Sequence, residues 1–128
     1  MFQPTKEMKA ILDQTAIWVL ASADQEGTPN AVPIFYTQVL ADGKLLLVDN
    51  FMNKTIENIQ QNPMVSVSVW QDKDGYQFKG NAVIETSGPN FETGKALAKT
   101  RDPKGVVVIA VDSVYTTAPG PAAGKKII

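Results

Sequence analysis

The chain has 128 residues, a length that suits one domain with a single buried core. We expect that domain to cover residues 1–128, with an irregular tail over about residues 116–128. The net charge is −1 and both signs are scattered, which excludes a basic surface for nucleic acid or an anionic membrane. No apolar run reaches the roughly 20 residues of a membrane helix, and the first residues lack the apolar core of a signal peptide. These features favour a cytoplasmic protein.

Cysteine and histidine are both absent from the chain. Their absence excludes disulfides, zinc sites built on these ligands, cysteine nucleophiles, histidine bases, Ser-His-Asp triads and haem held by histidine. Asp72 and Asp74 are not a convincing acid/base pair, because they lie in DKDG, a typical turn sequence. We therefore expect no catalytic side chain and no metal ligand, so that any reaction would depend on a bound cofactor.

Three short helices are predicted, over residues 4–14, 53–61 and 90–100. The first places Met8, Ile11 and Leu12 on one face, the spacing of an amphipathic helix. The second is followed by Asn62-Pro63, and the residue before a proline disfavours helix. These helices are short enough to be connectors between strands.

Six strands are predicted, over residues 16–22, 30–40, 44–49, 64–71, 76–87 and 105–114. Asp42-Gly43 is a hairpin turn between the second and third. Gly80 lies inside the fifth, where an interior glycine indicates a bulge or a sharp bend at a barrel corner. Strands joined largely by hairpins, with short helices between them, predict a mainly β, α+β fold built on a six-stranded antiparallel barrel.

Three of the predicted strands are apolar on both faces, at residues 16–21, 45–48 and 106–111. Antiparallel strands usually alternate apolar and polar residues, so the outer faces of these three need a cover. A second copy of the chain would provide it, and we expect a homodimer. The alternative is that the helices and the tail provide the cover within one chain.

The second predicted helix begins with Asn53, Lys54 and Thr55. A lysine is mildly unfavourable there, because the start of a helix already carries unpaired N–H groups and partial positive charge. The three residues would together suit a phosphate, with Asn53 as N-cap, Lys54 as the cation and Thr55 as a hydroxyl donor. The alternative is a solvated lysine on a surface helix.

The segment LLLVDNFMNKTIENIQQNPMVSVSVW, residues 45–70, carries a resemblance to a known family. PNAVPIFY before it, and YQFKGNAVIETSG and VYTTAPGPAAGK after it, extend the match in the same order over most of the chain. The chain resembles the FMN-binding split-barrel family, the relatives of pyridoxamine 5'-phosphate oxidase and of small FMN-binding proteins. The resemblance implies a split β-barrel, an FMN cofactor, a homodimer with the flavin near the interface, and a small-molecule substrate or reductant.

The resemblance also implies nine cofactor-binding residues: Val32, Pro33, Ile34, Val48, Asp49, Asn50, Asn53, Lys54 and Thr55. The first three would line the flavin ring, the next three would border the ring or the ribityl chain, and the last three would hold the phosphate. Val32 and Ile34 would equally suit a core, and Asn50 a turn. Pro33 is more specific, since proline in a strand is confined to edges and irregular positions.

The function that the resemblance implies is that of an oxidoreductase in which the flavin exchanges hydride or electrons with a small substrate or reductant. A non-enzymatic FMN-binding or electron-transfer protein is the alternative, and an oligonucleotide-binding small barrel is a third possibility. In the oxidase members of the family that this chain resembles, a C-terminal region with arginine and histidine binds the substrate phosphate. Here Arg101 is the only arginine and there is no histidine, so we expect no true pyridoxamine phosphate oxidase activity. We expect the last four residues to be frayed, and the segment before them to cover the flavin of a partner.

Overall fold

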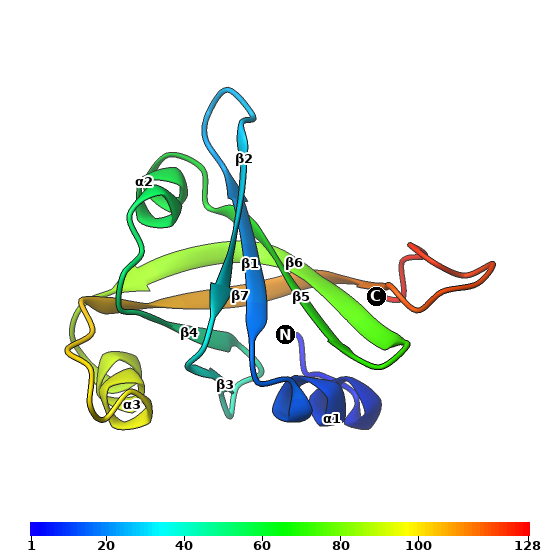
Figure 1. Ribbon diagram of the computed structural model, residues 1–128, viewed down its shortest axis with the longest axis horizontal. Coiled ribbons are helices and arrows are strands. Elements are labelled where there is room, and N and C mark those ends of the chain that lie inside the picture. Colours follow the sequence, from blue (N-terminus) through cyan, green and yellow to red (C-terminus); the bar gives the residue numbers. More distant parts are fainter.

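The computed structural model describes residues 1–128 and consists of one curled antiparallel sheet with three short helices (Figure 1). The strands are β1 (Trp18–Ala23), β2 (Pro29–Ile34), β3 (Thr37–Val39), β4 (Leu45–Asp49), β5 (Met64–Gln71), β6 (Asp74–Glu85) and β7 (Gly105–Thr116). The helices are α1 (Lys6–Gln14), α2 (Lys54–Gln61) and α3 (Pro89–Leu97). None of the three is long and apolar enough to cross a membrane. The predicted mainly β, α+β split barrel is confirmed.

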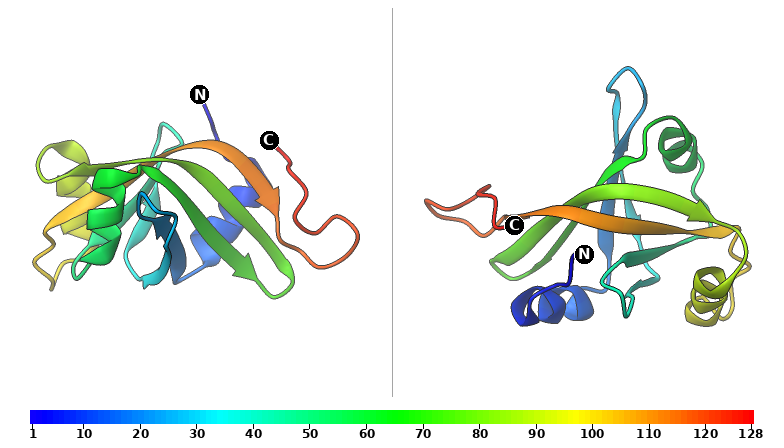
Figure 2. Two further views of the ribbon diagram at one scale, coloured as in Figure 1. Left: turned by 90° about the horizontal axis from the view of Figure 1, so that it is seen from above. Right: turned by 180° about the vertical axis from the view of Figure 1, so that it is seen from behind.

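The sheet has seven strands rather than six, because the strand expected over residues 30–40 is divided at Phe35 and Tyr36. The strand order is β2-β1-β5-β6-β7-β4-β3. β2 and β3 are therefore consecutive in the chain and yet lie at opposite edges of the sheet. A two-residue link joins opposite edges only if the sheet curls until those edges approach each other. The result is a half-barrel in which the edge strands β2 and β3 are not paired with each other (Figure 2). We call the open side of the half-barrel beside β2 the seam.

The interior of the half-barrel is filled by one cluster of 18 buried apolar residues. β5 contributes alternate residues, with Val65, Val67 and Val69 all buried, as its period-two pattern predicts. α1 adds Met8 and Leu12 to the same cluster. The helix is therefore part of the core rather than a surface connector.

Gly80 lies at the predicted bend of the long strand β6. The pairing of β6 with β7 shifts register between Lys79 and Gly80, which marks a β-bulge. A Cβ atom at Gly80 would collide with the backbone of Ala110 on β7. Only glycine allows the two strands to approach this closely, and the bulge lets the sheet curl here.

α3 covers the outer face of β4 and of the first half of β7. Leu46 and Val48 of β4 pack there with Val106 and Val108 of β7 and with Ala98, which follows α3. α3 therefore covers the outer faces of two of the strands that are apolar on both faces. This is the cover within one chain that we gave as the alternative to a homodimer. Other apolar side chains stay exposed on the outer face, with Met64 of β5 68% and Val83 of β6 59% accessible.

The C-terminal tail folds back along β7. Thr116 donates its N–H to Lys125 O at 3.0 Å, and Ile127 donates to Val114 O at 2.7 Å. The expectation of frayed final residues is therefore wrong. The reason is that pairing with β4 ends at Ile109, which leaves the second half of β7 with a free edge for the tail. The segment between the two paired stretches, residues 117–124, projects away from the barrel (Figure 1).

The packing of α3 on the sheet leads to a prediction about Gly94. Glycine to alanine inside a helix ordinarily stabilises by about 1 kcal/mol. At Gly94, however, the new Cβ would collide with Cγ1 of the buried Val106. We expect Gly94→Ala to lower the free energy of unfolding by about 1–3 kcal/mol, as measured in urea.

Ala96, exposed on the same helix, provides the control. Ala96→Gly should cost only the helix propensity of about 1 kcal/mol. If Gly94→Ala proved more stable than the parent, α3 would not pack against β7 as described.

Candidate functional site

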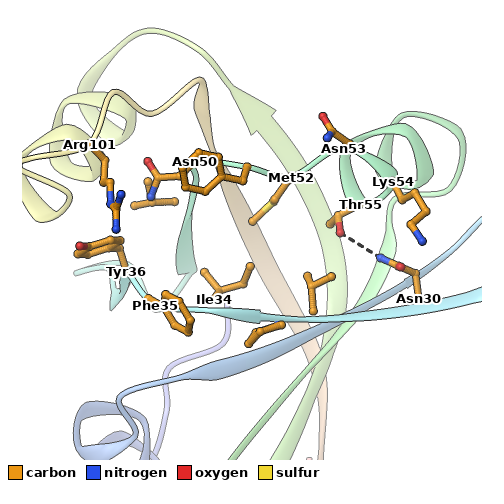
Figure 3. A pocket seen from close by; sticks show the side chains of 14 residues that line it. Asn30, Ile34, Phe35, Tyr36, Asn50, Met52, Asn53, Lys54, Thr55 and Arg101 are labelled. Carbon is orange, nitrogen blue, oxygen red and sulfur yellow. Dashed lines mark hydrogen bonds between the residues drawn. The ribbon is translucent and has the colours of Figure 1, made fainter.

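The seam beside β2 contains a cavity of about 230 Å³ (Figure 3). Its walls come from β2, from the end of β4, from the segment between β4 and α2, and from the first turn of α2. Eight of the nine residues expected at a cofactor site line it: Val32, Pro33, Ile34, Val48, Asn50, Asn53, Lys54 and Thr55. Six others complete the lining: Asn30, Phe35, Tyr36, Phe51, Met52 and Arg101. Asn30 and Arg101, 71 positions apart in sequence, are brought to one cavity only because the sheet curls.

One end of the cavity is formed by the start of α2. Asn53 occupies the N-cap position, as predicted, but its side chain makes no capping hydrogen bond. The first-turn N–H groups of the helix are thus left without a side-chain acceptor. Lys54 lies beside them, and no carboxylate comes within 4.0 Å of its ammonium group. This end of the cavity therefore carries uncompensated positive charge, which suits an anion.

Thr55 and Asn30 extend the same end. Thr55 is buried, and its hydroxyl accepts a hydrogen bond from Asn30 Nδ2 at 3.1 Å (Figure 3). Because a hydroxyl can donate as well as accept, the Thr55 proton stays free for a further acceptor. Asn30 was not among the expected site residues, since nothing near it in the sequence distinguishes it from a turn residue.

The middle of the cavity is apolar, and its wall is β2. This strand pairs only with β1, so it is an edge strand. Pro33 is therefore tolerated, because a proline on an edge removes no hydrogen bond from the sheet. Val32 and Ile34 also pack against the core cluster, so they serve both as core and as cavity wall.

Asn50 lies away from Lys54 and Asn30, toward Arg101 (Figure 3). Its Oδ1 atom is buried and has no hydrogen-bond partner. Leaving a buried acceptor unpaired costs about 1–3 kcal/mol. An unpaired amide at the border of a cavity therefore indicates a missing donor, which a ligand can supply.

Arg101 is a second unpaired cation of the cavity. Its guanidinium lies 5.9 Å from the centre of the Phe51 ring, and Figure 3 places it next to Tyr36. Arg101 makes no ion pair. Sequence reasoning missed it as a site residue, although it noted that this is the only arginine. Its position between α3 and β7 brings it to the cavity only through the packing of α3.

Asp49 is the expected site residue that does not line the cavity. Its carboxylate is buried, and Oδ1 accepts a hydrogen bond from Met52 N at 2.8 Å. The Lys104 ammonium lies 3.8 Å from the same oxygen. Burial raises the pKa of Asp49, while the Met52 N–H and the Lys104 charge oppose the shift. Asp49 therefore faces the protein rather than a ligand.

The sequence matches the pyridoxamine 5'-phosphate oxidase family over residues 4–118, nearly the whole chain. Together with the half-barrel, this match shows that the chain belongs to the pyridoxamine 5'-phosphate oxidase-like, FMN-binding split-barrel family.

Relatives agree with this assignment. An uncharacterized protein of Methanocaldococcus jannaschii is 38% identical over 130 residues, which cover 96% of this chain and 87% of that protein. HupZ of Group A Streptococcus superimposes with a TM-score of 0.83 at 28% identity, covering 95% of this chain and 100% of the other. An FMN-binding protein of Syntrophomonas wolfei superimposes with a TM-score of 0.78 over 88% of this chain and 84% of its own, but at 14% identity that likeness concerns the fold alone.

The raised pKa of Asp49 predicts a pH dependence of stability. Because the folded protein holds this proton more tightly than the unfolded chain, the contribution of Asp49 is greatest below the unfolded pKa of about 4. This contribution to stability declines as the pH rises through the pKa that Asp49 has in the folded protein. Asp49→Asn keeps an acceptor for Met52 N and removes the titration. We expect the stability of Asp49→Asn, relative to the parent, to improve between pH 4 and pH 7 in urea unfolding.

Asp102→Asn, an exposed change two residues before Lys104, is the control for a general effect of losing a carboxylate. A relative stability of Asp49→Asn that stayed flat or declined over this pH range would contradict the raised pKa.

Proposed function

We propose that the chain binds FMN in the cavity and acts as an oxidoreductase on a small substrate through the flavin. The observation that carries the proposal is the unpaired Lys54 ammonium at the uncapped start of α2. Unpaired positive charge at one end of a cavity whose middle is apolar suits a ligand with a phosphate at one end and a flat apolar body. Membership of the pyridoxamine 5'-phosphate oxidase-like, FMN-binding family supports the same choice.

The other residues present fit FMN as well. The flavin ring carries an imide N–H at its edge, and this donor matches the unpartnered Asn50 Oδ1. The apolar wall of Val32, Pro33 and Ile34 would lie against the ring. Lys54, Thr55 and the first N–H groups of α2 would hold the phosphate, and Arg101 would place a cation at the far end of the cavity.

When bound, FMN supplies hydride or electron transfer at its N5 position. The residues of the chain bind and orient it. The apolar wall would exclude water from one face. The N–H groups of the helix start at one end and the Asn50 acceptor toward the other would set the direction in which the ligand lies. The titratable side chains of the lining are Tyr36, Lys54 and Arg101, and none is a carboxylate.

A second candidate is an FMN-binding protein that transfers electrons without turning over a substrate. The lack of a carboxylate or histidine base in the lining favours it. The visible absorption spectrum of the purified protein, before and after FMN is added, tests binding for both candidates. Steady-state oxidation of a nicotinamide or deazaflavin reductant by the loaded protein then separates them, since only the enzyme sustains turnover.

Lys54→Ala tests the phosphate site. Loss of a charge-assisted contact of roughly 1.5–3 kcal/mol should weaken FMN affinity by about one to two orders of magnitude. Folding should be unaffected, because a lysine at a helix start does not stabilise the helix. Fluorescence titration of FMN measures the affinity.

Lys73→Ala, in the exposed turn between β5 and β6, removes the same charge far from the cavity and should leave affinity unchanged. Equal affinities of the Lys54 and Lys73 variants would remove Lys54 from the phosphate site.

We further propose that two chains form a homodimer with the flavin near the interface. Phe35 and Phe51, which line the cavity, are 62% and 79% exposed and would be covered by a partner. On the outer face of the sheet, the Ser66 hydroxyl is buried without a partner beside a groove whose lining includes Ala21, Ala23 and Gly80 together with Met64, Lys79 and Tyr115. The small residues and the unpaired hydroxyl would suit contact with a second chain.

Light scattering should therefore report about twice the chain mass of 13.9 kDa. The projecting segment 117–124 would reach the partner, since it leaves the barrel. Replacing Pro119–Ala123 by a glycine-serine loop of equal length keeps the pairing of Lys125–Ile128 with β7. We expect this variant to dimerise more weakly and to leave bound flavin more open to iodide quenching. A monomeric parent would contradict the dimer, and unchanged quenching would leave the segment without a part in the site.

A further inference from the structure

The turn formed by residues 49–52 connects β4 to α2 and borders the cavity. Asn50, Phe51 and Met52 all belong to the cavity lining. The turn also leads directly into Asn53 and Lys54, at the start of α2. Its conformation therefore sets both the position of the unpartnered Asn50 amide and the direction of the helix start.

Two charged side chains hold this turn through the backbone of Met52. Asp49 Oδ1 accepts the Met52 N–H at 2.8 Å, and Lys104 Nζ donates to the Met52 carbonyl at 2.7 Å. The Lys104 backbone N–H donates to Asp49 O at 2.9 Å, which fixes the lead into β7 against the end of β4. Both polar backbone groups of Met52 are thus satisfied by charged side chains, one from Asp49 at the start of the turn and one from Lys104 outside it.

The ion pair itself is the weaker part of this arrangement. The Lys104 ammonium is 3.8 Å from Asp49 Oδ1 but only 2.7 Å from the Met52 carbonyl, and the Lys104 side chain is half exposed. At this distance, and with a half-exposed ammonium, the charge–charge contact with Asp49 is the less specific of the two Lys104 contacts. Two short charge-assisted hydrogen bonds to one residue of an irregular turn restrict its backbone far more. The two hydrogen bonds to the Met52 backbone, rather than the ion pair between Asp49 and Lys104, are therefore the contacts that restrain the turn.

The start of α2 lacks the contact that would ordinarily share this role. Asn53 makes no capping hydrogen bond, which would ordinarily anchor the first turn of a helix. The turn before the helix is instead attached to the barrel by the buried Met52 side chain and by the two hydrogen bonds to the Met52 backbone.

We propose that Asp49 and Lys104 are positioning residues of the cavity: they hold Met52 from both sides and so preorganise Asn50 and the start of α2 for the ligand. A preorganised site binds more tightly because less conformational entropy is lost on binding. The restraint is a property of the apo protein, and its effect on affinity rests on the proposed binding of FMN.

The test compares Lys104→Met with Lys99→Met. Lys99 is an exposed lysine soon after α3 that makes no ion pair or side-chain hydrogen bond. In the apo protein, we expect exchange of the Met52 amide hydrogen to accelerate about ten-fold in Lys104→Met and to stay at the parent rate in Lys99→Met. FMN affinity should fall about ten-fold in Lys104→Met alone.

Lys104→Arg keeps a charged donor within reach of the Met52 carbonyl and should restore both slow exchange and parental affinity, which a general loss of stability would not do. If Lys104→Met did not fold, Lys104→Leu, which also removes the donor, would take its place with the same expectations.

Unchanged Met52 exchange would overturn the restraint. Faster exchange with parental FMN affinity would overturn the positioning role. If the parent itself did not bind FMN, the proposed function would fail, while the exchange measurements would still decide whether Lys104 restrains the turn.

Discussion

The two-residue link at Phe35 and Tyr36 is the constraint on which the rest of the structure depends. It joins strands at opposite edges of one sheet, so the sheet must curl until these edges approach each other. The bulge at Gly80 allows the curl, and α1 fills the interior that the curl creates. A cavity then remains along the seam, with the edge strand β2 as its wall. The fold and the site are thus two results of the same closure.

The cavity keeps two cations without anionic partners. Lys54 and Arg101 border it, and neither is paired with a carboxylate. Lysines elsewhere on the surface, such as Lys73 and Lys99, are also unpaired, so the lack of a partner does not by itself mark the site. What distinguishes Lys54 and Arg101 is that both border one cavity whose lining contains no carboxylate, and this favours an electron-rich or anionic ligand.

Buried polar groups divide into two kinds. The Asp49 carboxylate is satisfied within the chain, by Met52 N and the nearby Lys104, and contributes to the shape of the site without touching it. Asn50 Oδ1 and the Ser66 hydroxyl are unsatisfied, one beside the cavity and one in the groove on the outer face of the sheet. Unsatisfied buried groups are rare in folded proteins, and the proposed ligand and the proposed second chain would each supply a partner to one of these two atoms.

Local sequence determined most of the elements and three residues of the cavity lining, Asn53, Lys54 and Thr55. The valine alternation of β5 and the glycine inside β6 each predicted a local backbone geometry, because period and steric size act over a few residues. The helix start at Asn53, Lys54 and Thr55 indicated an anion for the same reason, and the family resemblance added the residues of β2 and β4.

Tertiary structure decided what depends on distant partners. The break at Phe35 follows from which edges the flanking strands pair with, and the paired tail follows from the free edge of β7. Asp49 faces inward because Met52 and Lys104 offer it a donor and a cation, and Arg101 reaches the cavity because α3 packs on β4 and β7. None of these contacts has a signal in nearby sequence, since each joins segments that meet only after the sheet has curled.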